Sequence, residues 1–580
     1  MLSSIKDLFF ILKISGIKNF YILSIFIFLN SFVELISLGL ILPVVSSYFN
    51  IEILEKVYNF LISINIIGLK IFLIENKENL LNYLILILLF IFFIKYSVNI
   101  AFSYYLSKQK VIYEKNIVNK LLQDLISSSN LNILNLPKSQ VMQHIMVRSS
   151  FIATSIINLS NLVVEFIVLI SLTFFFLISM GGISFYAIFI FSFISFLLFK
   201  YIKKKVVEWS YLKGIAGNER NKNLIDILEG ARELIIFRDF KKIFNDFRKS
   251  NYEYLEPNRK IAFWNSLPRT ILELVFVTFV LSYLFYISST NFEIEKATAL
   301  IASLMIVLFR AIPSLNRIIY HFTQFKYSSE PISIIKLLFD SLLKKRNVLD
   351  NSSISFKNQI DLKNINFNFN ENPNLFQNLS MQIKKNTKYA IIGETGIGKS
   401  TFIDLLSGLK EPTSGEIYID NNLLDVNKVN KWIQNIAYIS QRVYLFNSSI
   451  RNNITFKSDD EIIDNDKFKE IIKFVELENL INGKKEKELF SVGEFGGNVS
   501  GGQRQKIGIA RALYSGRKLL IFDESTNSLD KKTENEIIKK LSNLKDITII
   551  FITHSEQLTK NFDFVYKLEN KKLVSYDIST

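Results

Sequence analysis

The stretch Gly393-Glu394-Thr395-Gly396-Ile397-Gly398-Lys399-Ser400-Thr401 decides how the second half of this chain folds. It fits the pattern G-x-x-x-x-G-K-[ST] and lies between an apolar run, residues 389–392, and a helical pattern that begins near Thr401. Glycines let backbone N–H groups close around a polyphosphate, and a helix N-terminus adds positive potential. In such loops the lysine, here Lys399, contacts the β- and γ-phosphates and the serine, here Ser400, ligates Mg²⁺. The sequence therefore predicts a strand–loop–helix unit that binds ATP or GTP.

The composition indicates a membrane protein with a soluble part. The chain has 580 residues, 49% of them hydrophobic, and a formal net charge of +16. A nucleic-acid partner is not expected, because no zinc-finger, RRM or basic-helix pattern accompanies the charge. Part of the charge lies beside apolar runs, as at residues 203–205, where cytoplasmic flanks of membrane helices carry Lys and Arg. The absence of cysteine excludes disulfides and thiolate-held metals.

The first part of the chain contains six apolar runs, each long enough to cross a bilayer as a helix, which takes roughly 20 residues. They are residues 20–48, 80–106, 152–179, 183–202, 262–288 and 297–322. The long, basic connections after the second and fourth runs are expected in the cytoplasm, together with the N-terminus and the C-terminal domain. A purely soluble core cannot accommodate a run such as residues 84–94. We therefore predict a multi-pass membrane protein that contacts membrane lipids.

The same patterns divide the chain into three parts. Residues 1–327 are predicted as an all-α, six-helix membrane domain, 328–355 as a linker and 356–580 as an α/β nucleotide-binding domain. Residues 51–66 have the spacing of an amphipathic helix outside the membrane. Such a helix could rest on the membrane surface or a lipid tail, and a plain packing helix is an equal alternative.

Further motifs in the second part predict hydrolysis of the nucleotide. Asp523 and Glu524 end an apolar run that is typical of a buried parallel strand. One acid there can hold Mg²⁺ and the next can activate the attacking water. Upstream, the sequence VSGGQ at 499–503 precedes a helical pattern and predicts a second anion-binding helix N-terminus. His554 follows another apolar strand, 547–552.

With these motifs the C-terminal domain, about residues 356–580, resembles the ATPase domain of ABC transporters. The resemblance implies ATP and Mg²⁺ as cofactors, Glu524 as catalytic base, His554 as γ-phosphate sensor and Gln441 as the link between Mg²⁺ and the membrane domain. It implies that Phe369 stacks on adenine and that Asp530 lies in a loop communicating across a dimer. The residues expected to contact ATP are Phe369, Gly393, Glu394, Thr395, Gly396, Ile397, Gly398, Lys399, Ser400, Thr401, Ser500, Gly501, Gly502, Gln503 and Asp530, and those expected near the metal are Ser400, Gln441 and Asp523.

Six spans before one such domain resemble a type IV exporter half-transporter. One chain carries one phosphate loop and one VSGGQ motif, so a homodimer is expected to complete two sites. In such exporters short coupling helices dock on the ATPase, and here they are expected near residues 132–140 and 226–237. The implied activity is ATP hydrolysis coupled to transport.

Four cations within the apolar runs bear on the cargo: Lys95, Arg269, Arg310 and Arg317. Charges at this depth are costly, which makes them candidates for a functional site. They could form a cationic cavity for a phosphate-bearing headgroup, because guanidinium groups bind phosphate oxygens bidentately. Alternatively, they could pair with the acids of the same runs, Glu34, Glu165 and Glu273.

Three stretches of sequence from both domains, together with the expected external helix at residues 51–66, carry a finer resemblance. The stretches LPRTILE (267–273) and FRAIPSLNRII (309–319), together with YLFNSSIRNNITF (444–456), are similar to the bacterial lipid-linked oligosaccharide flippase of protein N-glycosylation. That family implies a location in the bacterial cytoplasmic membrane and a polyprenyl pyrophosphate-linked glycan as cargo, with its pyrophosphate in the basic cavity. An exporter of lipid A, another lipid, a peptide or a drug is the alternative.

Overall fold

The chain forms two compact units. The computed structural model describes residues 2–16, 20–49, 79–127, 137–180, 182–289, 294–346, 356–369, 372–394, 396–425 and 428–576, and also Glu55 and Asn59. One unit is helical and comprises Met1–Ser127 and Leu134–Leu342, whereas the other contains Leu343–Thr580. The expected external helix at 51–66 lies outside the described residues, except for those two positions.

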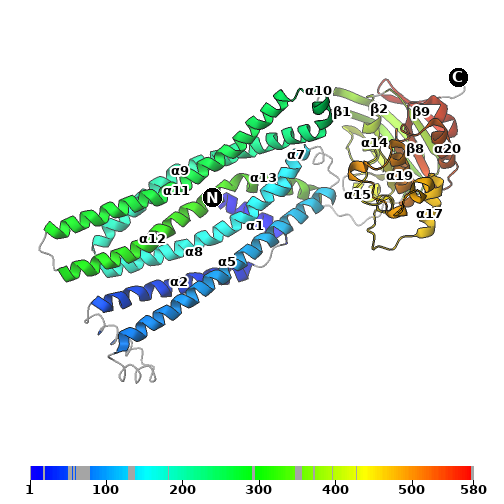
Figure 1. The fold of residues 1–580 in the computed structure, drawn as a ribbon. Coiled ribbons are helices and arrows are strands. Elements are labelled where there is room, and N and C mark those ends of the chain that lie inside the picture. Colours follow the sequence, from blue (N-terminus) through cyan, green and yellow to red (C-terminus); the bar gives the residue numbers. More distant parts are fainter. Residues whose placement is uncertain are drawn as a thin grey trace. The chain divides into compact units, whose positions relative to one another are not determined.

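The helical unit is a bundle of long helices, drawn from blue to green in Figure 1. Each predicted span lies within one helix: α2 (Phe20–Phe49), α5 (Leu80–Ser127), α8 (Ser149–Met180), α9 (Gly182–Glu229), α11 (Lys241–Ser289) and α12 (Ile294–Tyr327). Three segments of the described part, Leu81–Ile126, Lys138–Phe174 and Lys241–Ser282, are long and apolar enough to cross a membrane. Helices of 48 or 49 residues, such as α5, α9 and α11, extend roughly 70 Å at 1.5 Å per residue. Since a bilayer core is about 30 Å thick, these helices continue well outside it.

Shorter helices complete this unit. They are α1 (Leu2–Ile14), α7 (Lys138–Met142), the π-helix η2 (Gln143–Arg148), α10 (Ala231–Phe237) and α13 (Ser329–Arg346). The second expected coupling segment contains α10, which exposes Ile235, Ile236 and Phe237. The first, 132–140, is described only from Pro137, where α7 follows.

The region predicted as a linker, 328–355, differs from that expectation over most of its described length. Residues 329–346 are helical, and Ile332, Ile335 and Phe339 are fully buried in the core of the membrane unit. These positions repeat every three or four residues, which places them on one face of a helix. The lysine-rich end of α13 suggested a solvated connection, but the apolar spacing before it determines the packing.

The second unit, which begins at Leu343, contains two sheets. Its strands are β1 (Gln359–Phe369), β2 (Asn372–Lys384), β3 (Lys388–Ile392), β4 (Ser414–Ile419), β5 (Asn422–Leu423), β6 (Ile436–Ile439), β7 (Leu519–Asp523), β8 (Thr548–Thr553), β9 (Phe564–Glu569) and β10 (Lys572–Ser575). The first sheet has the order β2-β1-β4-β5 and is antiparallel. The second has the order β10-β9-β3-β8-β7-β6, with parallel pairing from β9 through β6.

The parallel sheet is covered on both faces. Every residue of β3, β7 and β8 is buried, as expected for strands with helices on two sides. Alternate residues enter different cores: Phe522 and Phe551 pack in one, whereas Ile521 and Ile550 pack in the other. The helices are α14 (Lys399–Leu406), α15 (Val429–Ile433), α16 (Ile450–Thr455), α17 (Asn465–Phe474), α18 (Glu478–Asn482), α19 (Gly501–Tyr514) and α20 (Lys531–Ser542). The described residues thus show the expected fold class, a bundle containing the six predicted spans followed by an α/β domain.

Candidate functional site

Four adjacent parallel strands bring the candidate catalytic groups together. Gly393 follows β3, Gln441 lies just beyond β6, Glu524 follows β7 and His554 follows β8. The carboxyl ends of parallel strands meet at one edge of a sheet, which is where ligands of open α/β sheets bind. Sheet topology therefore gathers groups that are far apart in the sequence.

The phosphate loop has the backbone that its glycines permit. Gly396 and Gly398 have φ values of 86° and 110°, which L-residues with a side chain rarely adopt. A Cβ at Gly398 would also lie 3.1 Å from the ring of Phe376. Both conditions require glycine, so the loop can turn sharply into α14. Thr395, the remaining predicted loop residue, lies outside the described residues.

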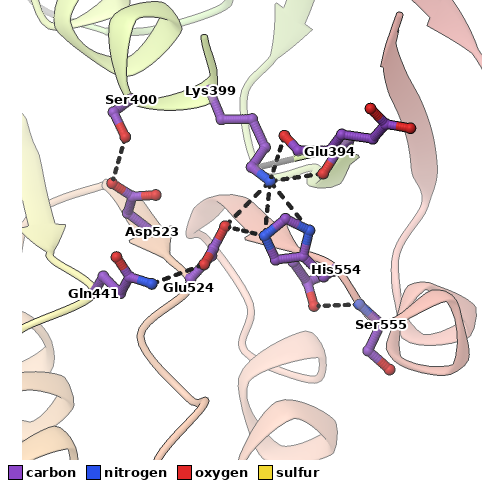
Figure 2. A network of polar contacts seen from close by, with 10 residues as sticks. Glu394, Lys399, Ser400, Gln441, Asp523, Glu524, His554 and Ser555 are labelled. Atoms are coloured by element: carbon purple, nitrogen blue, oxygen red, sulfur yellow. Dashed lines mark hydrogen bonds and ion pairs between the residues drawn. The ribbon is translucent and has the colours of Figure 1, made fainter. Parts of the chain in front are cut away.

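Lys399 is the first residue of α14 and its ammonium group is almost fully buried. Its Nζ donates to the carbonyl oxygens of Gly393, at 2.7 Å, and Glu394, at 3.3 Å. It also lies 3.1 Å from Oε1 of Glu524 and 3.0 Å from Nε2 of His554. Figure 2 shows the ammonium group pointing into this cluster. The lysine is thus held where the loop closes, at the position predicted from its motif.

Glu524 is the centre of the cluster. Its Oε1 lies 2.5 Å from Nε2 of His554, and its Oε2 accepts a hydrogen bond from Nε2 of Gln441 at 2.9 Å (Figure 2). Its φ is +49°, an uncommon conformation for a non-glycine residue and one that occurs at functional sites. The structure brings the three predicted catalytic residues, Glu524, His554 and Gln441, within hydrogen-bonding reach.

Asp523 and Ser400 form a separate pair suited to a magnesium ion. The Ser400 hydroxyl donates to Oδ2 of Asp523 at 3.4 Å. Magnesium is bound in proteins by hydroxyl or carboxylate oxygens together with substrate phosphates, so this donor set fits the ion. Burial raises the pKa of Asp523, and the neighbouring Glu524 carboxylate acts in the same direction. A cation at this position would favour the ionised form.

Tyr438 is a site residue that the sequence reasoning missed. It lies on β6, and its hydroxyl donates to the same Oδ2 of Asp523 at 3.0 Å. The tyrosine therefore fixes the orientation of a carboxylate predicted to lie near the metal. A tyrosine inside an apolar strand suggests core packing, and only its position three residues before Gln441 could have pointed to the site.

The predicted second anion site has a well-formed helix N-terminus. Ser500 caps α19: its hydroxyl accepts from the backbone N–H of Gln503 at 3.2 Å, and Oε1 of Gln503 accepts from the N–H of Ser500 at 2.9 Å. This reciprocal pair is a capping box. A Cβ at Gly502 would lie 3.1 Å from the carbonyl oxygen of Ser528, which explains the small residue there. Asp530 caps the next helix, α20, by accepting from the N–H of Thr533 at 3.0 Å.

The structure does not bring all predicted ATP contacts together in one chain. Among the described residues, no hydrogen bond or ion pair joins Ser500–Gln503 to the Lys399 cluster. Phe369 is the last residue of β1, in the antiparallel sheet, where its backbone is opposite Asn372. It is therefore on a different sheet from β3, which precedes the phosphate loop.

Each of the four membrane cations contacts an acid. Nζ of Lys95 lies 3.2 Å from Oε1 of Glu34, and Arg310 contacts the same oxygen. Nε of Arg317 lies 2.5 Å from Oε1 of Glu165. The contacts of Glu34 join α2 to α5 and α12, and the contact of Glu165 joins α8 to α12.

Arg269 differs from the other three cations. Its Nε is 2.7 Å from Oε1 of Glu273, four residues along the same helix, and both side chains are exposed. The pairing considered as an alternative in the sequence is thus present in the structure, and only Arg269 pairs within its own helix.

Comparisons with known proteins agree with this architecture. Residues 376–527 match the family described as ABC transporter. The "ATP-dependent lipid A-core flippase" of Wigglesworthia glossinidia brevipalpis is 29% identical over 374 residues, 63% of each chain. The "Glutathione/L-cysteine transport system ATP-binding/permease protein CydC" of Haemophilus influenzae is 24% identical over 356 residues, 60% of this chain and 61% of that one. The chain thus matches about three fifths of the length of these curated relatives.

A solved structure extends the likeness to nearly the whole chain. A bacterial Atm1-family ABC exporter with ATP bound superposes with a TM-score of 0.77 at 16% identity, covering 96% of this chain and 95% of that one. At this identity the likeness establishes the fold alone.

The relatives leave the finer resemblance drawn from the sequence unconfirmed. Those quoted above are a lipid A-core flippase and a glutathione/cysteine transporter, not a flippase of protein glycosylation. These likenesses are to proteins named as transporters, and the described helices include three segments long and apolar enough to cross a membrane. The chain has the fold of an ABC exporter half-transporter, with a helical membrane domain followed by an ABC transporter ATPase domain.

Proposed function

We propose that this chain is one half of an ATP-driven exporter that moves a phosphate-bearing lipid across the bacterial inner membrane. The observation that carries the proposal is the combination of the cluster around Glu524, in which Lys399 and Gln441 contact its carboxylate, with arginines on α12 that are only partly buried. Relatives that carry the name lipid A-core flippase favour a lipid A-like or other phosphate-bearing lipid over a polyprenyl pyrophosphate glycan.

The cluster supplies the groups that hydrolysis requires. Glu524 would take a proton from the attacking water as the water oxygen bonds to the terminal phosphorus and the bond to the ADP oxygen breaks. Lys399 would stabilise the charge on the phosphate oxygens. Because Lys399 contacts Glu524 in this structure, a phosphate that binds the lysine would release the carboxylate to accept the proton. Gln441 and His554 hold Glu524 on its other sides.

Ser400 and Asp523 would hold magnesium, which supplies charge neutralisation to the phosphates when bound. Tyr438 keeps Asp523 oriented toward Ser400 through its hydroxyl. These residues act by positioning oxygen donors, and the proton transfer is left to Glu524.

A homodimer is part of the proposal. Ser500 lies at the N-terminus of α19 and is exposed, so it is accessible to a second chain. One phosphate loop from each chain and one capped helix from its partner would form two equivalent sites, as two-fold symmetry requires. In mixed dimers, a Lys399→Ala chain with a Ser500→Arg chain should retain one intact site, whereas hydrolysis by a monomer at the dimer rate would contradict the shared site. The exposed apolar face of α10 is the proposed coupling surface.

The cargo is tested by mass spectrometry of lipids that co-purify with Glu524→Gln, a substitution that should slow turnover. Enrichment of lipid A-type or other phosphate-bearing lipids over the bulk membrane supports the proposal. Enrichment of a polyprenyl pyrophosphate glycan would instead favour the alternative cargo predicted from the sequence. Lipids in the same proportions as the membrane would contradict a lipid exporter.

A further inference from the structure

We propose that Glu34 and Glu165 are specificity-determining residues, because they are buried counter-ions that set how much negative charge a lipid must carry to bind α12. The inference rests on the proposed function and deepens it by assigning the charge selectivity of the same site to two acids. Neither acid has a role in ATP hydrolysis, and both lie on helices of the membrane domain.

The acids contact a single polar stripe on α12. Arg310, Ser314, Arg317 and His321 follow one another at intervals of four, three and four residues, so they lie on one face of the helix. Ser314 donates to Oε2 of Glu165 at 2.6 Å, and Nη2 of Arg317 donates to the same oxygen at 3.4 Å.

The last residue of this stripe, His321, also contacts α8. Nδ1 of His321 lies 3.0 Å from Oδ1 of Asn158, which is seven residues before Glu165. The stripe of α12 therefore meets a matching polar row on α8. These contacts fix the position along the two helices at which Arg317 and Glu165 meet.

Burial distinguishes the acids from the arginines. The side chains of Glu34 and Glu165 are 4% and 11% exposed, whereas those of Arg310 and Arg317 are 23% and 40% exposed. A molecule approaching this face therefore meets guanidinium groups, and the carboxylates lie behind them. The arginines are the groups that would bind the lipid. The acids behind them would compete with its phosphate for the same guanidinium groups.

The charges do not cancel. Lys95, Arg310 and Arg317 provide three positive charges, and Glu34 and Glu165 provide two negative charges, which leaves one net positive charge. Three uncompensated cations at membrane depth would be costly, so the acids allow the helices to keep them. Glu34 forms ion pairs with two cations, Lys95 and Arg310.

A phosphate group competes with these carboxylates. Both present oxygen atoms that match the fork of an arginine, and the more highly charged group binds more strongly. A zwitterionic headgroup adds no net charge to balance the excess, whereas a headgroup with two phosphates can replace a carboxylate contact. The two acids therefore favour lipids of high phosphate charge and disfavour the bulk lipids of the membrane.

The test measures lipid binding to the full-length dimer in detergent. The probes are lipid A with two phosphates, phosphatidylglycerol, phosphatidylcholine and inorganic phosphate, and the readouts are Kd and Tm. Wild-type protein should bind lipid A most tightly. Glu34→Gln or Glu165→Gln should lower the Tm without lipid. Each should also lower the Kd for phosphatidylglycerol by roughly tenfold, because a negative charge that competes with the lipid for the arginines is removed.

Two matched variants separate this role from a structural one. Glu165→Asp keeps the charge and should keep the wild-type order of lipid affinities, even if its Tm falls. Glu273→Gln removes an acid whose partner, Arg269, is on the same helix, and should leave the lipid Kd values unchanged.

The outcomes distinguish this inference from the proposed function. If the wild type binds lipid A tightly and the glutamine variants bind phosphatidylglycerol no better, the inference about the acids fails and the proposed function stands. If the wild type binds all three lipids equally, or inorganic phosphate as well as lipid A, both fail.

Discussion

The two domains place their clustered charged side chains in different settings. In the ATPase domain, Lys399 at the start of α14 meets Glu524 and His554, which follow β7 and β8, at one edge of a sheet. In the membrane domain, Arg317 and Glu165 meet across two helices, and the polar row around them fixes how α8 and α12 pack. The same types of side chain therefore support catalysis in one domain, and helix pairing with the proposed selectivity in the other.

The largest expected effect is on the catalytic carboxylate. Glu524→Gln should slow ATP hydrolysis by about 10²- to 10⁴-fold, because the amide cannot accept the proton that a carboxylate takes. Nucleotide binding should persist, since Lys399 and its loop remain. Steady-state phosphate release and nucleotide titration measure the two effects. Glu556→Gln, an exposed acid beyond the cluster, is the control, and near-normal turnover in Glu524→Gln would remove that residue from its role.

A buried pair in the helical unit should matter for stability. Nη2 of Arg148 lies 2.8 Å from Oε1 of Glu330, and both side chains are largely buried. Arg148→Ala should cost about 3–5 kcal/mol, because it leaves a carboxylate without its partner. Thermal unfolding of the purified protein measures the loss.

An exposed pair in the same unit supplies the control. Lys138 lies 3.1 Å from Glu229, with both side chains in solvent. Lys138→Ala should cost less than about 1 kcal/mol. Equal losses for Arg148→Ala and Lys138→Ala would show that burial does not decide the strength of these pairs.

The smallest effect is expected at Tyr438. Tyr438→Phe removes one hydrogen bond to Asp523 and should raise the Mg²⁺ concentration needed for tight ATP binding by roughly 3- to 10-fold. Binding of ATP without Mg²⁺ should not change. Tyr418→Phe removes a hydroxyl that bonds Glu416 on the other sheet and serves as control. If the Tyr438 variant has the Mg²⁺ dependence of the wild type, the hydroxyl of Tyr438 has no role in orienting Asp523 for the metal.

The domains also differ in what the sequence could predict. Lys399 and Glu524 lie in local motifs whose residue types and positions indicate the chemistry, so both could be predicted before the structure. The role of His554 was predicted from the resemblance to ABC transporter ATPases. Tyr438 could not, because its role depends on the pairing of β6 with β7.

In the membrane domain the charged residues could be found but their partners could not. Glu165 and Arg317 are 152 residues apart, and hydropathy does not say which helix faces meet. The sequence therefore left both a cationic cavity and ion pairing open. The helix α13 was missed for a related reason, since a basic segment obscured the apolar spacing of Ile332, Ile335 and Phe339.

The most direct test of the proposed exporter is lipid movement in proteoliposomes, measured beside ATP hydrolysis in the same vesicles. Wild-type protein should move a phosphate-bearing lipid only with ATP and Mg²⁺, and Glu524→Gln should lose both activities. Arg310→Ala and Arg317→Ala should lose lipid movement while basal hydrolysis continues, and Arg→Lys should recover part of it, because an ammonium group lacks the bidentate fork. Folded, ATPase-active variants at Arg310 and Arg317 that still move the lipid at the wild-type rate would contradict the proposal.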